Sequence, residues 1–165
     1  MQPLIILIRG PMASGKSTTI KALAEKLDNF IFIDREHLKH LVLKNLERDK
    51  RVKISKRILY FLMKEIMKLK KNLLIQETSE SDMKKHLRNY INQFHYKIMV
   101  FYLDCSVNTA IKRDLKRSNK RRSNTVKEIH NKIRPEKGDI IINTEYNSSK
   151  DVLKVIRYNI KMIIK

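Results

Sequence analysis

The chain of 165 residues has the length of one domain, and its single cysteine, Cys105, excludes an intramolecular disulfide and a metal site built from several cysteines. The formal net charge of +20 favours a polyanionic partner such as RNA or DNA, although a lysine-rich proteome would also produce it. Because no apolar run approaches membrane-spanning length and no signal-peptide pattern is present, we expect a cytoplasmic location and no membrane partner.

The first predicted elements are a strand, a loop and a helix. Leu4 to Ile8 are consecutive apolar residues, typical of a buried parallel strand, and apolar residues recur at helical spacing from Ser17 to Leu27. Between them, the run Gly10-Pro11-Met12-Ala13-Ser14-Gly15-Lys16-Ser17-Thr18 matches the phosphate-binding pattern G-x-x-x-x-G-K-[ST] throughout. Strand, loop and helix in this order are the context that the pattern requires.

The motif predicts a site for ATP and Mg²⁺. Backbone N–H groups of the loop and the positive end of the helix would hold phosphate oxygens. Lys16 would reach the terminal phosphates, and the Ser17 hydroxyl would bind the metal. The nucleotide is expected to contact Gly10, Ala13, Ser14, Gly15, Lys16, Ser17 and Thr18.

Phe30 to Ile33 are the second predicted strand, and a helical stretch follows Asp34 and Glu36. A long helix with a basic exposed face is predicted from Val52 to Leu69. Its expected buried stripe is Ile54, Ile58, Leu62, Ile66 and Leu69. Asn72 to Gln76 are the third strand, which ends at Glu77.

A further helix is marked by the apolar residues Met83, Leu87, Tyr90, Ile91 and Phe94. Two more strands, Ile98 to Leu103 and Asp139 to Ile142, precede a closing helix from about Ser149 to Ile164. Strands that alternate with helices predict an α/β fold: a five-stranded parallel sheet sandwiched by helices, in a single domain over residues 1–165.

Polar residues at the carboxyl ends of the strands are candidates for chemistry, because ligands bind at this edge of a parallel sheet. Glu36 is favoured, since it follows a strand that is expected to neighbour the phosphate loop, where an acceptor hydroxyl would approach. Glu77 is a second candidate. Asp34 and Asp104 could instead cap helices or turns, and for Asp104 we favour that interpretation. Cys105 is expected to be a buried strand-end residue and not a nucleophile.

The segment from about 112 to 137 is strongly basic. It could be a solvated helix face, but after a strand end we favour a lid that brings arginines over a transferring phosphoryl group. Arg113 and Arg117 are one helical turn apart, so that both can face the same nucleotide.

Together these motifs resemble the small P-loop kinases that include the polynucleotide 5′-hydroxyl kinases, over about Leu4 to Arg122. The matching runs are the phosphate loop, Ile33 to Lys39, Ile75 to Thr78, Leu103-Asp104 and Lys112 to Arg117. The resemblance implies that Glu36 activates the acceptor hydroxyl, that Lys39 and Glu77 bind the acceptor, and that Arg113 and Arg117 contact the donor phosphates.

Three features depart from that family. Glutamate stands where aspartate is usual at Glu36 and Glu77, and Lys39 replaces an arginine, so that it cannot form a bidentate fork with a phosphate. The run from Arg134 to Thr144 resembles the last strand of adenylylsulfate kinases and other small-molecule kinases. Within it, Gly138 is expected in a turn, and Asn143-Thr144 either borders the nucleotide base or is a plain strand end.

The sequence therefore predicts an ATP- and Mg²⁺-dependent kinase that transfers the γ-phosphate to a hydroxyl, with Lys16, Glu36, Arg113 and Arg117 as catalytic residues. A 5′-hydroxyl end of RNA or DNA is favoured as acceptor, because the basic lid and the basic helix from Arg48 to Lys71 could both follow a phosphate backbone. The alternatives are a small hydroxyl compound, such as a nucleoside, nucleotide or adenylylsulfate, and nucleotide-dependent RNA binding without catalysis.

Overall fold

The computed structural model describes residues 2–77, 80–117 and 123–164. One parallel sheet has the strand order β2-β3-β1-β4-β5. The strands are β1 Leu4–Arg9, β2 Phe30–Ile33, β3 Asn72–Gln76, β4 Lys97–Asp104 and β5 Ile140–Asn143. The predicted α/β fold is confirmed. Two parts of the predicted motifs lie outside the described residues. They are Thr78 and the part of the predicted lid that contains Lys120, Arg121 and Arg122.

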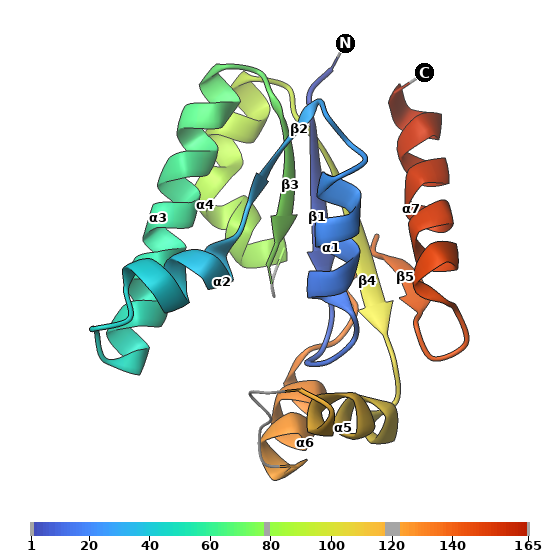
Figure 1. Cartoon of the computed structure of the whole chain (residues 1–165). Coiled ribbons are helices and arrows are strands. Elements are labelled where there is room, and N and C mark those ends of the chain that lie inside the picture. Colours follow the sequence, from blue (N-terminus) through green and yellow to red (C-terminus); the bar gives the residue numbers. More distant parts are fainter. Residues whose placement is uncertain (1, 78–79, 118–122, 165) are drawn as a thin grey trace.

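Helices cover both faces of the sheet (Figure 1). They are α1 Lys16–Ala24, α2 Arg35–His37, the π-helical turn η1 Leu38–Val42, α3 Arg48–Lys68, α4 Glu80–Gln93, α5 Val107–Leu115, α6 Ser123–Lys132 and α7 Ser149–Ile164. Helices α1 and α7 pack on one face and α3 and α4 on the other, while α5 and α6 lie beyond the carboxyl ends of the strands. This end of the sheet therefore holds every predicted functional residue.

Strand β1 is buried along its whole length, as its continuous apolar sequence predicts for a central parallel strand. Ile6 and Ile8 pack in the core beneath α1 and α7, whereas Ile5 and Leu7 pack beneath α3 and α4. Alternation of side chains along one strand thus fills both layers. The phosphate loop that follows β1 is anchored in the centre of the molecule.

The second strand is not adjacent to the first in the sheet. Strand β2 is an edge strand that pairs with β3, and β3 lies between β2 and β1. The connection from β1 through α1 to β2 leaves space for one strand between β1 and β2. Strand β3, which comes later in the sequence, occupies this space. Because Ile8 is in register with Gln76, the end of β3 is the strand end next to the phosphate loop on this side.

The buried stripe of α3 also differs from the expected one. Its fully buried apolar side chains include Leu59, Met63 and Met67, which follow one another at i, i+4 and i+8. Ile58 lies at the border of the contact, and Leu69 is 68% exposed. The stripe is shifted by one residue, and Leu62 and Ile66 of the expected stripe pack at its border, where they are partly buried.

Candidate active site

The loop after β1 has a backbone that only part of the amino-acid alphabet can adopt. Gly10 has a φ of +139°, and a Cβ there would lie 2.2 Å from the Leu103 carbonyl oxygen of β4. Gly15, which caps the start of α1, has a φ of +93°, and Ala13 has a φ of +60°. Left-handed residues of this kind form the backbone nests that bind anions. The sequence motif therefore corresponds to a loop suited to phosphate.

Lys16 lies inside this loop. Its Nζ donates a hydrogen bond of 2.5 Å to the Pro11 carbonyl oxygen. Burial of the ammonium, followed by repulsion from Arg117, lowers the pKa of Lys16 to about 8, against the opposing effects of Cys105 and Glu36. A buried cation whose charge is held by a backbone carbonyl is well suited to exchange that carbonyl for a phosphate oxygen.

Oxygen donors fit a magnesium ion beside the loop. The Ser17 hydroxyl donates a 3.4 Å hydrogen bond to Oε1 of Gln76, and the carboxylates of Asp34 and Glu77 line the same pocket. Among the described residues, no group of three His, Cys, Asp or Glu side chains forms a metal cage. Hydroxyl, amide and carboxylate oxygens are the ligands of Mg²⁺, which is commonly held by one or two side chains together with phosphates.

A pocket opens on the β2 side of Lys16. Its lining residues are Lys16, Ser17, Ile20, Lys21, Phe32, Asp34, Arg35, Glu36, Gln76 and Glu77. The structure thus brings Glu36 and Glu77 together with Lys16, although β2 is not adjacent to β1. We call this cavity the acceptor-side pocket.

Glu36 is held in place by basic side chains. Lys39 Nζ lies 2.5 Å and His40 Nε2 lies 3.3 Å from its Oε2 atom. Burial raises the pKa of Glu36, but the hydrogen bond and charge of Lys39, together with Arg35 and His40, outweigh this effect and bring the pKa below its usual value. Glu36 is therefore ionised at neutral pH. Lys39 binds Glu36 and does not line the pocket itself.

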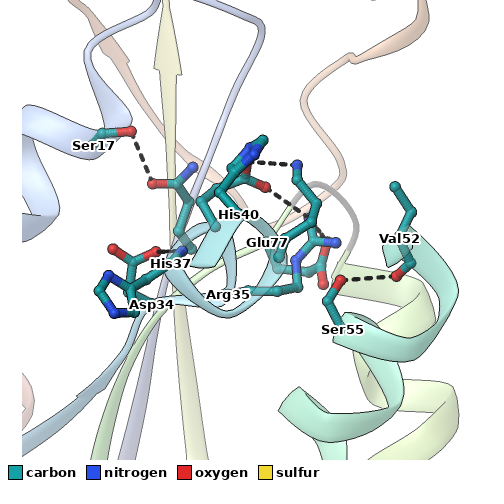
Figure 2. Close-up of polar contacts among 11 residues, drawn as sticks. Ser17, Asp34, Arg35, His37, His40, Val52, Ser55 and Glu77 are labelled. Atoms are coloured by element: carbon teal, nitrogen blue, oxygen red, sulfur yellow. Dashed lines mark hydrogen bonds and ion pairs between the residues drawn. The ribbon is translucent and has the colours of Figure 1, made fainter. Parts of the chain in front are cut away.

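Arg35 was not singled out from the sequence, yet its side chain lines the acceptor-side pocket. Its Nη2 atom lies 3.8 Å from Glu36 and 3.9 Å from Glu77, whose side chain is buried (Figure 2). A basic residue between two acidic ones at a strand end was the available signal. The neighbouring Asp34 accepts a 3.0 Å hydrogen bond from His37 N, so that it caps α2, as the alternative interpretation had it.

A second pocket lies on the other side of the loop, toward β5 and α7. It is lined by Ala13, Ser14, Gly15, Thr18, Thr19, Arg113, Arg117, Thr144, Asn147, Ser149 and Val152. Arg113 of α5 and Arg117, which follows the end of α5, thus share one cavity with the phosphate loop. We call it the donor-side pocket.

Thr144 positions Arg113 in the donor-side pocket. The guanidinium donates to Oγ1 of Thr144 at 3.0 Å and to its carbonyl oxygen at 2.6 Å. Thr144 in turn donates from its N–H and Oγ1 to the carbonyl oxygen of Asp104. Arg117 is half exposed and lies 3.6 Å from Asp114. Arg113 is therefore fixed by the backbone, whereas Arg117 is held by one ion pair.

The expectation that Asp104 caps a helix or turn is wrong. Asp104 is the last residue of β4, and Ser106 caps α5 by accepting a 3.2 Å hydrogen bond from Thr109 N. Asp104 pairs with Asn143 of β5 and so remains part of the sheet, and Ser106, two residues later, caps the helix. Cys105 is buried, as predicted, and burial raises the pKa of its thiol.

The basic segment after α5 is tied to the sheet at several points. His130 Nε2 lies 2.8 Å from the Cys105 carbonyl oxygen, and Val126 shares a small core with Ala13 of the phosphate loop. Arg9, at the end of β1, donates to the Arg134 carbonyl oxygen at 2.8 Å. Gly138 lies in the turn before β5, as predicted, with a φ of +97°.

A sequence model of the Zeta toxin family matches residues 1–159. The chain belongs to the Zeta toxin family. A search of curated proteins found no match. Among the helices that the structure describes, none combines the length and the apolar character needed to cross a membrane.

Solved structures give this Zeta toxin family chain the fold of P-loop kinases. A candidate kinase from Chloroflexus aurantiacus superposes with a TM-score of 0.78 at 17% identity, over 98% of this chain and 97% of that one. The Mycobacterium tuberculosis APS kinase in complex with AMPPNP and APS gives 0.71 at 15% identity, over 97% and 98%. A chain of the Pnkp1/Rnl/Hen1 RNA repair complex gives 0.64 at 17% identity, over 78% and 43%.

The resemblance to small P-loop kinases is thereby confirmed at the level of fold and family. Two pockets flank the phosphate loop of this Zeta toxin family member. One carries two arginines, and the other carries the ionised carboxylate of Glu36.

Proposed function

We propose that the chain, as one kinase domain over residues 1–165, transfers the γ-phosphate of ATP to a hydroxyl group. The observation that carries this proposal is the position of the phosphate loop between the two pockets. Its Lys16 shares one pocket with Glu36, and its Ala13 to Gly15 share the other with Arg113 and Arg117. A phosphoryl group has to pass between a donor and an acceptor that lie roughly in line. The arrangement supplies one pocket for each.

On the donor side, the loop amides and Lys16 bind the triphosphate, and Ser17 with Gln76 would hold Mg²⁺, which neutralises phosphate charge when it is bound. Negative charge spreads over the oxygens of the moving group in a loose transition state. Arg113 and Arg117 stabilise that charge. Because Arg113 is already fixed on Thr144, little reorganisation is needed when the charge develops.

On the acceptor side, Glu36 orients the hydroxyl and takes its proton. Its lowered pKa makes it a weak base for an alcohol, so that proton transfer is expected late, when the bond to the phosphoryl group has largely formed. The acceptor hydroxyl has to replace a contact of Lys39 or His40 with the carboxylate. Glu77 and Arg35 form the wall against which the rest of the acceptor binds.

For the acceptor we favour the 5′-hydroxyl end of RNA or DNA. The high positive charge of the chain and the exposed cations at the start of α3, which follows α2 and η1, support a polyanionic acceptor. The likeness to a chain of an RNA repair complex points in the same direction. Lys39, which the family resemblance implies for an acceptor phosphate, could take this role after release from Glu36.

A small hydroxyl compound is the second candidate. Its support is the likeness to an APS kinase, which extends over nearly the full length of both chains. Arg35 and the apolar side chains of Ile20 and Phe32 line an acceptor-side pocket that would also accept a single nucleoside or sugar.

The test is transfer of label from γ-labelled ATP to a panel of 5′-hydroxyl oligonucleotides, nucleosides and adenylylsulfate, with the wild type and Glu36→Gln. We expect the variant to lose about 100-fold or more in kcat with ATP affinity unchanged, because general-base catalysis contributes this much. Glu65→Gln, an exposed carboxylate paired with Lys68 on α3, is the matched control and should retain full activity. Equal loss of turnover and ATP binding in Glu36→Gln would contradict the assigned role. ATP binding without transfer to any acceptor would favour a nucleotide-dependent RNA-binding protein instead.

A further inference from the structure

One exposed side of α7 carries a row of basic residues. Lys150, Lys154, Arg157 and Lys161 are all exposed and recur at i, i+4, i+7 and i+11. At 1.5 Å per residue they form a row about 16 Å long on one side of the helix. A different side of α7, which includes Val152, Ile156 and Ile160, is buried against the sheet. The row therefore takes no part in the core.

This row lines a groove that a second element completes. Besides the four cations of α7, the groove is lined by Lys26, Leu153 and Tyr158. Lys26 follows the end of α1, which packs beside α7 (Figure 1). Cations from two elements thus converge on one concave surface, which lies outside both pockets of the candidate active site.

Among the described residues, most of these charges have no ion-pair partner. Lys154 lies 3.5 Å from the carboxylate of Asp151. Lys26, Lys150, Arg157 and Lys161 make no ion pair with any residue in the described part of the chain. Unpaired charges of one sign around a groove with low-dielectric walls concentrate the field and attract a polyanion.

An aromatic ring stands beside the cations. Tyr158 is 64% exposed and follows Arg157 directly on α7. Exposed aromatic rings next to a basic groove are the features on which single-stranded nucleic acids bind, since phosphates pair with the cations and bases stack on the ring.

We infer that the groove between α7 and the end of α1 binds single-stranded RNA or DNA. Phosphates lie along Lys150, Lys154, Arg157 and Lys161, and one base stacks on Tyr158. This binding does not depend on phosphoryl transfer, so that a strand is held there whether or not its end is the acceptor. An anionic membrane is the competing partner. It is less favoured because Val152, Ile156 and Ile160 of α7 are buried in the core, although Val155, Tyr158 and Met162 are exposed.

The test is a triple variant, Lys154→Gln, Arg157→Gln and Lys161→Gln. Its matched control, Lys84→Gln, Lys85→Gln and Arg88→Gln, removes the same charge from exposed residues that line a groove at α4. Binding of a fluorescent single-stranded RNA of about 12 nucleotides is measured by anisotropy as a function of salt. Loss of three phosphate contacts should weaken binding about 100-fold near 0.1 M salt and reduce the slope of log K against log salt by about 2.

The control variant should bind within about threefold of the wild type, and Tyr158→Ala should weaken binding about 10-fold, including at high salt where stacking persists. Melting temperatures near that of the wild type would show that the variants fold. Equal losses in the α7 and α4 triple variants would overturn the proposal, because binding would then reflect total charge alone. It would also be overturned if the wild type bound vesicles of phosphatidylcholine and phosphatidylserine but not RNA, or bound neither.

Discussion

At the scale of single residues, the phosphate loop depends on a backbone that most side chains would disrupt. Gly10 is the clearest case, because its positive φ coincides with a close approach to the Leu103 carbonyl oxygen of β4. A Cβ at this distance forces the backbone of the loop or of β4 to move. Gly10 is thus required both by its positive φ and by the close approach of β4. The approach of β4 could not be predicted from the sequence motif.

Gly10→Ala should destabilise the fold by about 3 kcal/mol, since backbone strain and steric overlap add. Gly138→Ala is the matched control: its φ is also positive, at +97°, but a Cβ there would contact nothing within 4 Å, so that about 1 kcal/mol is expected. Urea unfolding of both variants measures the difference. Equal losses would show that strain, and not the contact with β4, determines the need for Gly10.

The lowered pKa of Lys16 predicts a pH dependence of nucleotide affinity. In the free protein this pKa is about 8, and bound phosphates favour the charged form, so that binding takes up a proton at higher pH. Affinity for MgATP should therefore fall about 5-fold from pH 8 to pH 9, because the protonated fraction of Lys16 falls by this factor. Arg117→Gln removes the second cause of the low pKa and should shift this fall to higher pH. An affinity that is constant from pH 7.5 to 9.5 would contradict a phosphate contact of Lys16.

At the scale of elements, the positions of the strands in the sequence were predicted well, whereas their order in the sheet was not predicted. The apolar runs of β1 and β4 are recognisable because central parallel strands are buried on both faces. The edge position of β2 depends on where the crossover through α1 returns, which no local pattern encodes. The role of Arg35 and the attachment of Lys39 to Glu36 were missed for the same reason: they depend on side-chain direction in a short helical turn.

Arg9 connects two elements that the sequence does not show to be in contact. Its buried guanidinium lies 2.6 Å from Glu136 and 3.3 Å from Asp139, at the segment that leads from α6 to β5. The ring of Tyr102 lies 5.7 Å away. The end of β1, where the phosphate loop begins, is thereby joined to the end of the predicted lid. We expect α6 to stay in place while the protein works.

Arg9→Met should destabilise the protein by about 3 kcal/mol, because it leaves buried carboxylate charge without its principal cation. The double variant Arg9→Met, Asp139→Asn should recover part of this loss, since the substitution removes the charge that Arg9 compensated. Thermal unfolding measures both. Additive destabilisation in the double variant would show that Arg9 and Asp139 do not interact.

At the scale of the whole molecule, two binding pockets and a separate basic groove lie around α1. The phosphate loop starts this helix, the acceptor-side pocket lies against it, and the groove lies between its end and α7. Composition predicted a polyanionic partner, but it could not locate the surface, because basic residues occur on nearly every helix. The P-loop kinase fold could be predicted because a specific loop motif occurred with the correct strand and helix around it, whereas no sequence motif pointed to the Zeta toxin family.

The central claim is that the loop from Gly10 to Thr18 binds the triphosphate of a nucleotide together with magnesium. Calorimetric titration of the wild type and of Lys16→Met with ATP, each with Mg²⁺ and with EDTA, tests it most directly. The wild type should bind ATP with an affinity that falls at least 10-fold without the metal, and Lys16→Met should lose at least as much through its missing charge–phosphate contact. A folded wild type that bound no nucleotide, or bound it equally well without magnesium and without Lys16, would contradict the account.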